Sequence, residues 1–514
     1  MAAATARHYD FIVCGSGPGG AACVRGLLRG APTARIAMLE RGPWSKTDLL
    51  SEHNPVKAWL GSRAVVADYA HDVVQGAAMG GGSAVNNYAW VTPSAEDVQR
   101  SFGLSREQCG EATLAEYEAM CDGLLAERAA PHLLHKLLTM DLPRGTELVD
   151  NAAVRVRSTN RGKVFLGSPT LTAGGARRSA LTGVIEPLWR ENFARLDIVP
   201  DTAVDRVLFD EGGAGEAGCR AVGVQTSDGE RWSAEHVVLA AGCLETPALL
   251  LRSGVGPEEQ LAQHGIPVVL VNEHVGQHLR DKMLLDDMLM TDSTLGDFDK
   301  SLLIVNRVFD DGASVQLHRY DKSTVGNSYL ALKRLVLGSW QDGGLSALAS
   351  GIGRAAEFAS PKGYAAFCFQ TYFKMKSEAS VTLGPPGAAG GPKATLDASA
   401  LFAEAAQHEA EFRARTSEIY EKIFEMRAKG RIAYEPCVRG IRSSPAKHMR
   451  LVWHFAGSAR VGDVVDADDF SVLGVKGLHI ADMSAARVCP DGGAMAMAYL
   501  AGHLCAARML GEKN

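Results

Sequence analysis

A glycine-rich turn directly after a short apolar strand constrains this chain more than any other feature. Residues 10–14 are Asp-Phe-Ile-Val-Cys, which is typical of a buried strand, and residues 15–20 are Gly-Ser-Gly-Pro-Gly-Gly. In the pattern G-x-G-x-x-G, Gly15 allows a tight turn, Gly17 lets the backbone approach a pyrophosphate, and Gly20 lets helix and sheet pack closely. Because a small-residue stretch (19–30) and another apolar run (35–39) follow, the segment predicts a strand–helix–strand unit of a doubly wound sheet.

An acidic residue at the end of the second predicted strand specifies the ligand further. Glu40 comes 25 residues after Gly15, where a carboxylate can accept hydrogen bonds from both hydroxyls of a ribose. The same charge would repel a 2′-phosphate, which argues against NADP. The pattern alone does not separate FAD from NAD. The nucleotide contacts expected here are Gly15, Ser16, Gly17, Pro18, Gly19, Gly20, Glu40 and Arg41.

A second glycine-rich segment, residues 79–90, has the sequence Met-Gly-Gly-Gly-Ser-Ala-Val-Asn-Asn-Tyr-Ala-Trp. Glycines there would let the backbone pass against a flat ring, and Ser83 and Asn86 could form hydrogen bonds with its heteroatoms. Taken alone, the segment could also be a glycine-rich surface loop. We expect a ring-binding segment, which would distinguish a flavin from a nicotinamide.

The length of 514 residues predicts two domains, or one core with a large insertion. Apolar strands like the first ones return within 196–240 and at 478–482, and a helix is expected over about 493–510. Between residues 282 and 450, short alternating runs (302–305, 314–318, 365–373 and 380–383) predict an antiparallel sheet, the segment 385–392 predicts a loop, and the stretch 402–429 predicts a long amphipathic helix.

The expected fold class is therefore α/β. A doubly wound, Rossmann-like nucleotide domain is assembled from the discontinuous segments 1–100, 175–281 and 451–514. An α+β substrate-binding or cap domain with an antiparallel sheet is formed by 101–174 and 282–450.

Composition excludes several other functions. The net charge of −6, without a Lys/Arg-rich block, argues against nucleic-acid binding. The ten cysteines form no C-x-x-C pair, so their spacing indicates neither a metal site nor a dithiol redox site. The N-terminus has no apolar core of a signal peptide, and the apolar run 237–241 is too short to span a membrane. We expect a soluble cytoplasmic protein that acts on a small molecule, without a membrane partner.

Taken together, the motifs resemble those of the glucose-methanol-choline (GMC) oxidoreductases, FAD enzymes that oxidise alcohols. The resemblance covers most of the chain. Besides the two glycine-rich segments and Glu40, it includes residues 242–256, in which only Cys243 departs from the family pattern, and residues 275–281, where His278 replaces an Asn. Residues 454–458 and 474–484 look like the C-terminal block of the family.

The resemblance implies FAD as the cofactor and further contacts with it. The stretch from Asn86 to Trp90 would run along the flavin, Val204 would meet the adenine, and Asp482 would lie near the ribityl chain and pyrophosphate. Val85 stands where some relatives attach FAD through a His, so we expect a non-covalent flavin. The further contacts expected are Met79, Gly80, Gly81, Ser83, Asn86, Asn87, Tyr88, Ala89, Trp90, Val204, Ala241, Gly242, Asp482, Gly493, Ala494 and Met495.

Oxidation of an alcohol by a flavin requires removal of the hydroxyl proton and hydride transfer to the flavin N5. His454 matches the catalytic His of the family, and a neutral imidazole can accept a proton near pH 7. The second catalytic position, usually His or Asn, falls at Gly493, eleven residues after Asp482. Asp491 could replace it only if the loop were shifted. Lys282, where many relatives have His, is expected to be a solvated surface residue.

The leading hypothesis is an FAD-dependent alcohol oxidase or dehydrogenase that forms an aldehyde or ketone. Because Gly493 has no side chain to hold the reacting oxygen, the same fold could instead support a lyase or a light-driven decarboxylase. A flavoprotein without enzymatic activity is the third possibility. The substrate, the electron acceptor (oxygen or another) and the oligomeric state stay open. Cys243 and Cys489 are expected to be small core thiols.

Overall fold

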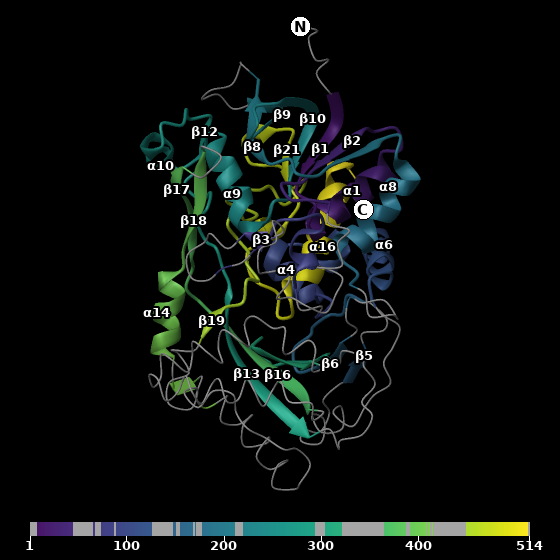
Figure 1. Ribbon diagram of the computed structural model, residues 1–514, viewed down its shortest axis with the longest axis vertical. Coiled ribbons are helices and arrows are strands. Elements are labelled where there is room, and N and C mark those ends of the chain that lie inside the picture. The colour runs from purple at the N-terminus through teal and green to yellow at the C-terminus, as the bar shows by residue number, and fades with distance from the viewer. Residues whose placement is uncertain are drawn as a thin grey trace.

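The computed structural model describes residues 8–44, 65–66, 73, 75–86, 89–125, 148–150, 155–167, 170, 177–210, 219–292, 304–320, 364–386, 391–408, 410–411, 414 and 449–511. These residues contain two large sheets. One lies near the N-terminus at the top of Figure 1, and the other lies at the bottom.

The upper sheet is the expected doubly wound sheet. Its strands are β1 (His8–Cys14), β2 (Ile36–Leu39), β7 (Leu196–Val199), β8 (Val204–Phe209), β9 (Cys219–Thr226), β10 (Arg231–Leu239), β20 (Val475–Lys476) and β21 (Leu478–Ile480). They follow the order β20-β9-β10-β1-β2-β7, with β21 beside β10 and β8 beside β9. Strand β1 is parallel to both of its neighbours, β10 and β2, and the pairs β2–β7 and β10–β21 are also parallel. The pairs β8–β9 and β9–β10 are antiparallel. The predicted assembly from discontinuous segments is thus confirmed.

The apolar runs of the sequence form the centre of this sheet. Ile12 and Val13 in β1 and Val237 and Val238 in β10 are completely buried. Parallel strands covered on both faces require such continuous apolar runs, because no side of the strand meets water.

Helices lie beside the upper sheet and between the two sheets (Figure 1). The helices are α1 (Pro18–Gly30), α4 (Ala95–Phe102), α5 (Arg106–Cys109), α6 (Glu111–Asp122), α8 (Glu186–Asn192), α9 (Gly242–Arg252), α10 (Glu258–Gln263), α14 (Ser399–Gln407) and α16 (Ala494–Met509). Shorter helical turns are η1 (Gly81–Ala84), η2 (Leu181–Ile185) and η7 (Met483–Ala485).

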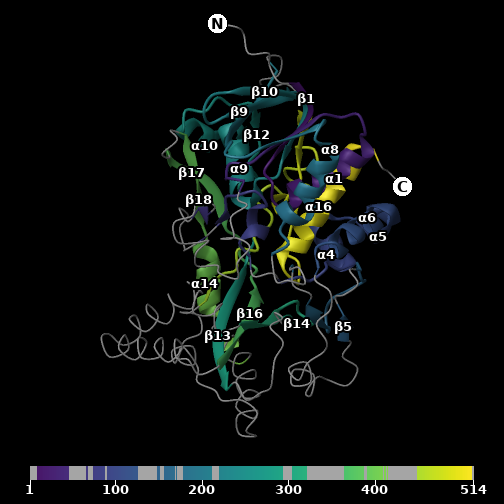
Figure 2. The same cartoon turned by 45° about the vertical axis from the view of Figure 1, so that its right-hand side comes forward.

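Helices α1 and α16 lie side by side in both views (Figures 1 and 2). Glycine permits this close contact. A Cβ on Gly26 would lie 2.6 Å from the Cβ of Ala506, and a Cβ on Gly502 would lie 1.9 Å from the carbonyl oxygen of Gly19. The C-terminal helix is therefore packed directly on the helix that follows the N-terminal glycine-rich turn.

The lower sheet is the predicted antiparallel sheet, except that the run 380–383, which was expected in it, lies in a separate two-stranded pair. Its strands are β5 (Leu148–Asp150), β6 (Val164–Gly167), β13 (Lys282–Asp292), β14 (Ile304–Val308), β15 (Ser314–Tyr320), β16 (Tyr364–Lys374) and β19 (Arg450–Leu451), in the order β19-β13-β16-β15-β14-β6-β5. Every neighbouring pair is antiparallel except β5–β6.

Three two-stranded pairs complete the described elements: β3 (Val65–Val66) with β4 (Gln75–Gly76), β11 (Val255–Gly256) with β12 (Leu270–Val271), and β17 (Ser380–Pro386) with β18 (Pro392–Asp397). Of the loop expected at 385–392, residues 385–386 lie in β17, residue 392 lies in β18, and residues 387–390 lie outside the described residues. Of the helix expected at 402–429, the first part lies in α14, and most of the rest falls outside the described residues. The exact division into two domains stays a prediction.

No helix in the described part of the chain is long and apolar enough to cross a membrane.

Candidate active site

A cavity of about 990 Å³ opens at the carboxyl ends of β1 and β2. Ligands of open α/β sheets bind at this edge. The volume lies at the upper end of the range of roughly 300–1,000 Å³ that is usual for ligand pockets. The cavity is lined by both glycine-rich segments, the start of α9, the segment around His454 and the start of α16.

The glycines of the first segment have different roles. Gly15 has φ +108°, and a Cβ there would lie 2.3 Å from the carbonyl oxygen of Ala240. A Cβ on Gly20 would lie 2.1 Å from the carbonyl oxygen of Gly15. In contrast, no described atom lies within 4 Å of a Cβ built on Gly17. Packing therefore requires glycine at 15 and 20, whereas Gly17 keeps the cavity open where α1 begins.

Glu40 is fixed at the end of β2. Its Oε2 accepts hydrogen bonds from the Ser16 amide (3.0 Å) and the Ser16 hydroxyl (2.6 Å), and its Oε1 accepts one from the Gly42 amide (3.0 Å). The residue is only 5% exposed but lines the cavity. The carboxylate thus connects the glycine-rich turn to strand β2, and it faces the cavity.

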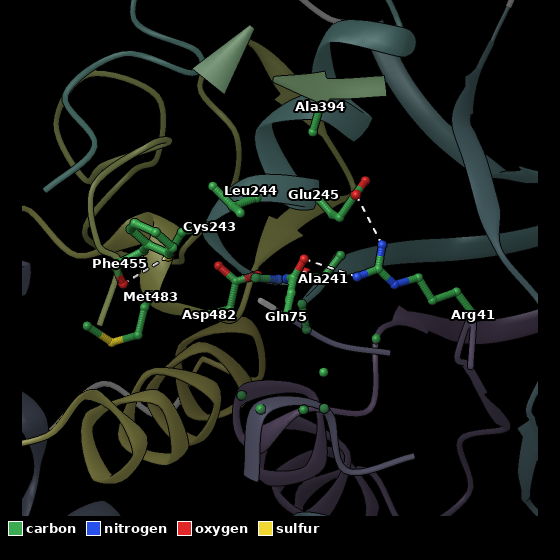
Figure 3. Close-up of a pocket in the computed structure, with 18 of the residues that line it drawn as sticks. Arg41, Gln75, Ala241, Cys243, Leu244, Glu245, Ala394, Phe455, Asp482 and Met483 are labelled. Atoms are coloured by element: carbon green, nitrogen blue, oxygen red, sulfur yellow. Dashed lines mark hydrogen bonds and ion pairs between the residues drawn. The ribbon is translucent and has the colours of Figure 1, made fainter. Parts of the chain in front are cut away.

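Arg41 connects three segments on one side of the cavity (Figure 3). Its guanidinium donates to Glu245 at the start of α9 and to the side-chain oxygen of Gln75, both at 3.0 Å. Gln75 in turn donates to the carbonyl oxygen of Ala241 at 3.2 Å. Sequence reasoning predicted Arg41 and Ala241 here but missed Gln75 and Glu245, because their partners lie far away in the chain.

The second glycine-rich segment packs against the first. A Cβ on Gly81 would lie 2.8 Å from the Cα of Gly17. Ser83 donates to the carbonyl oxygen of Gly80 at 2.6 Å. Asn86 donates to the Met495 sulfur at 2.8 Å. Ser83 and Asn86 were predicted to contact the ligand. In the structure they also form hydrogen bonds that hold the second glycine-rich segment in place.

Arg177 is a further residue that sequence reasoning missed. It is buried and donates to the side-chain oxygen of Asn86 (2.8 Å), to the carbonyl oxygen of Asn86 (2.8 Å) and to that of Ser83 (3.1 Å). No motif marks it in the sequence.

The predicted site residues that the structure describes divide into two groups. Those that line the cavity are Gly15, Gly17, Pro18, Gly19, Glu40, Arg41, Gly81, Ser83, Asn86, Ala89, Val204, Ala241, Gly242, His454, Asp482, Gly493, Ala494 and Met495. Ser16, Gly20, Met79, Gly80 and Trp90 are buried behind this lining. Asn87 and Tyr88 lie outside the described residues.

Asp482 joins the end of β21 to the start of α9. Its Oδ2 accepts hydrogen bonds from the Gly242 amide (2.8 Å) and the Thr246 hydroxyl (2.6 Å). Its Oδ1 accepts from the amide of Ser484 at 2.8 Å and from the hydroxyl of the same residue. The carboxylate is therefore held rigidly at the cavity wall.

His454 lies in an unusual backbone segment. The preceding residue, Trp453, has φ +67°, a conformation that costs a bulky residue about 1–3 kcal/mol. Asp281 holds this segment: its Oδ2 accepts the amides of Val452 and Trp453, both at 2.9 Å, and its Oδ1 accepts the amide of His454 at 3.0 Å. Burial raises the pKa of Asp281 to about 7, and these donors act in the opposite direction.

The imidazole of His454 lines the cavity and packs against other side chains. It stacks on the ring of Tyr372, with ring centroids 5.8 Å apart and an interplanar angle of 12°. Its Nδ1 is buried and has no hydrogen-bond partner among the described residues. Burial, followed by the charges of Lys282 and Arg450, lowers the pKa of His454 to about 3. The ring is therefore neutral at pH 7.

Gly493 lies beside this imidazole. Of the described atoms, only Cε1 of His454 lies within 4 Å of a Cβ built on Gly493, at 3.9 Å. The backbone has φ −73° and ψ 150°, which any residue can adopt. Glycine at this position is thus not required by the fold, and it leaves space next to the imidazole.

The prediction that Lys282 is a solvated surface residue is wrong. Lys282 is 2% exposed, and its Nζ donates to the carbonyl oxygens of Asp491 (2.9 Å) and Gly492 (2.8 Å). Burial, with a smaller effect of the Lys374 charge, lowers its pKa to about 8. The sequence could not reveal this, because both acceptors are backbone atoms about 210 residues away.

The side chain of Asp491 points into an ion-pair cluster and not into the cavity. It contacts Arg100 (2.9 Å), Arg161 (3.0 Å) and Lys374. Burial alone would raise the pKa of Asp491, but Lys374 and Arg100 reverse this effect and lower it to about 2. Asp491 therefore does not replace the side chain that Gly493 lacks.

The expectation of core thiols is confirmed. Cys243 and Cys489 are both buried and unpaired. Each Sγ faces a backbone carbonyl, that of Phe455 at 3.1 Å for Cys243 and that of His454 at 3.2 Å for Cys489.

The cavity combines a dinucleotide-type glycine turn on a doubly wound sheet, an acidic residue after β2 and a neutral imidazole. This combination is typical of enzymes that use a bound nucleotide cofactor. Comparison with known families identifies the class further. The N-terminal family model of the GMC oxidoreductases matches residues 9–284, and the C-terminal model matches residues 393–502. The chain therefore belongs to the GMC oxidoreductase family. The members of this family are FAD-binding flavoproteins, so FAD is the cofactor.

Two relatives of known sequence share 30% identity or less with this chain over the matched residues. A GMC-type oxidoreductase of Rhodococcus erythropolis is 30% identical over 312 residues, which cover 54% of this chain and 59% of the relative. Choline oxidase of Arthrobacter globiformis is 27% identical, and the match covers 54% of this chain and 55% of that enzyme. The chain thus matches little more than half the length of these relatives.

Solved structures agree in fold over nearly the whole chain. A formate oxidase of Aspergillus oryzae superposes with a TM-score of 0.70 at 19% identity, covering 99% of each chain. Pyridoxine 4-oxidase from Mesorbium loti gives a TM-score of 0.71 at 17% identity, covering 97% of this chain and 98% of that one. At these identities the likeness concerns the fold.

Proposed function

We propose that this protein oxidises an alcohol to an aldehyde or ketone, with His454 as the base and FAD as the hydride acceptor. One observation supports this most directly. The neutral imidazole of His454 and the glycine-rich dinucleotide cradle line the same cavity. A group that can remove a hydroxyl proton therefore lies in the space where the cofactor would bind.

The residues present fit a flavin dinucleotide. No described atom lies within 4 Å of a Cβ built on Gly17 or on Gly82, so side chains are missing where a cofactor would need room. Glu40 would hold the ribose, and the start of α1 would face the pyrophosphate. Val85 lines the cavity and has no nucleophile, which supports non-covalent binding. When bound, FAD supplies a hydride acceptor at its N5.

The chain would contribute the proton transfer. The low pKa of His454 keeps the imidazole unprotonated at pH 7. It also makes the ring a weak base, so the proton transfer would depend on groups that stabilise the developing alkoxide. The charges of Lys282 and Arg450 that oppose an imidazolium would also stabilise a negative oxygen. Tyr372 stacks on the ring and would fix its orientation.

Lys282 would act as a positioning residue. Its Nζ fixes the carbonyl groups of Asp491 and Gly492, directly before Gly493. Because Gly493 lies beside His454, this contact would set the width of the space available to the substrate.

The substrate would approach from the lower sheet. Leu284, Gln316, Tyr372 and Arg450 of this sheet line the same cavity as the glycine-rich segments. This supports the proposed division of labour, in which residues 1–100, 175–281 and 451–514 bind FAD while 101–174 and 282–450 bind a small-molecule substrate. We also propose the cytoplasm as its location, on the sequence evidence alone.

A second candidate is a non-standard flavin reaction, such as a lyase or a light-driven decarboxylase. Gly493 favours it, because no side chain there can bind the reacting oxygen. One structural neighbour is named a formate oxidase, and formate is not an alcohol.

An anaerobic substrate panel separates the two candidates. Purified protein with bound FAD is mixed without oxygen with primary, secondary and aromatic alcohols, and flavin absorbance is followed. Our proposal predicts that at least one alcohol bleaches the flavin and yields the matching carbonyl compound. Bleaching by none, together with release of carbon dioxide from a carboxylate under blue light, would favour the second candidate.

A further inference from the structure

We propose that His274, His278 and Asp463 form a binding site for one divalent transition-metal ion, of which Zn²⁺ is the best fit. One ligand atom of each residue lies within 4.8 Å of the others. None of the three lines the FAD cavity, so this site is separate from the active site.

The two imidazoles already converge. Nδ1 of His274 and Nε2 of His278 are 3.0 Å apart, close to the separation of two nitrogens that each lie about 2.0–2.1 Å from one zinc ion. The backbone of His278 has φ +61°, a left-handed conformation that turns the chain sharply after the turn carrying His274. This is also the position where the GMC pattern has Asn, whereas this chain has an imidazole there, which binds metal ions more readily.

Glu378 prepares His278 for metal binding. Its Oε2 lies 2.7 Å from Nδ1 of His278, and its Oε1 accepts a hydrogen bond from Arg280 at 2.6 Å. A carboxylate at Nδ1 places the proton of a neutral imidazole there and leaves the lone pair on Nε2, which faces His274. Metal-binding histidines almost always have such a partner on the other ring nitrogen.

Asp463 provides the third ligand. Its Oδ2 pairs with Arg460, and no hydrogen bond among the described residues reaches its Oδ1. Two imidazoles and one carboxylate are a ligand set that zinc accepts, with water at the remaining position. A hollow of about 390 Å³ next to His274 and His278 leaves room for that water.

The position of the site suggests its role. His278 is followed by Arg280, whose backbone exchanges two hydrogen bonds with Ala456, at 2.7 and 3.0 Å. Ala456 is two residues from His454. An ion held by His274, His278 and Asp463 would fasten the turn at 274–278 to the loop at 463 and so stabilise the support of the catalytic segment.

Zinc binding tests the proposal. Tag-free protein with bound FAD is treated with a chelator, dialysed, and titrated with zinc chloride by calorimetry. Thermal unfolding is recorded with and without zinc. We expect one zinc ion per chain and a higher Tm with zinc. The Glu378→Gln variant should bind zinc about 10–100-fold more weakly, and His278→Asn and His274→Gln should be weaker still. His408→Gln, at a half-buried His outside the cluster, should bind like the unchanged protein.

Other outcomes would overturn the proposal. These are the absence of saturable zinc binding, or a dissociation constant that stays the same in His278→Asn and His274→Gln. Retained FAD and a cooperative melt without zinc establish that each variant is folded. If His278→Asn fails this check, His274→Gln decides the question, because His274 is exposed.

Discussion

The carboxylate of Asp281 accepts the backbone amide of His454 at 3.0 Å. It also accepts the amides of Val452 and Trp453. A residue from the middle of the chain thereby fixes the backbone of the proposed base, including the left-handed Trp453. This relationship explains how a strained segment keeps one geometry beside the cavity.

Replacing Asp281 by Asn should therefore destabilise the protein and misplace His454. A side-chain amide can accept at only one atom, so some of the backbone donors lose their partner. Hydrogen bonds to charged groups contribute about 1.5–3 kcal/mol each. We therefore expect the free energy of unfolding to fall by at least the contribution of one such bond. Denaturant unfolding measures the stability, and the rate of anaerobic flavin reduction measures the activity. Unchanged values of both would contradict this role.

The activity should survive mild acid. Because the pKa of His454 is lowered to about 3, the free enzyme should keep an unprotonated base well below the usual value of about 6.5. We expect kcat/KM to show no loss centred near pH 6.5 when measured from pH 5 to 8. A drop with its midpoint there would indicate an ordinary histidine.

The lowered pKa of His454 also predicts that the free energy of unfolding depends on pH. The unfolded chain binds a proton at His454 below about pH 6.5, whereas the folded chain does not until about pH 3. Stability due to this residue is therefore lost as the pH falls through that range, by at most about 1.4 kcal/mol per pH unit. His454→Gln should make the free energy of unfolding less dependent on pH between 4 and 6. An unchanged slope would contradict the low pKa.

Removing the Lys282 ammonium should loosen the loop before Gly493. Lys282→Met leaves two buried carbonyl oxygens without their donor, and an unsatisfied buried group costs about 1–3 kcal/mol. We expect a lower Tm and a lower kcat. Lys476→Met, at an exposed lysine, is the matched control. Equal melting curves for the two variants would argue against the positioning role.

Local motifs were predictable from the sequence, and contacts between distant segments were not. The turn at Gly15–Gly20 and the carboxylate at Glu40 depend on residues within one strand–helix–strand unit, so their spacing alone locates them in the cavity. Lys282 looked like a surface residue, because lysine usually is one and its acceptors are backbone atoms. Arg177 and Tyr372 belong to no motif, and only the folded chain brings them to Asn86 and His454.

Gly493 offers a test of the space beside the imidazole. Its backbone angles suit any residue, and Gly→Ala at such a site stabilises a protein by about 0.4–1 kcal/mol. We expect Gly493→Ala to bind FAD and melt no lower than the unchanged protein. It should nevertheless raise KM, because the methyl group would lie 3.9 Å from Cε1 of His454. A clear loss of stability would show that this space is needed by the fold.

The rate of anaerobic flavin reduction in His454→Ala tests the proposed function most directly. An alcohol that bleaches the unchanged protein is mixed with the variant in a single turnover, after equal FAD content has been verified. We predict that reduction slows by about 10²–10⁴-fold, the usual contribution of a general base, while FAD stays bound. Reduction at the same rate in both proteins would contradict the assignment of His454 as the base.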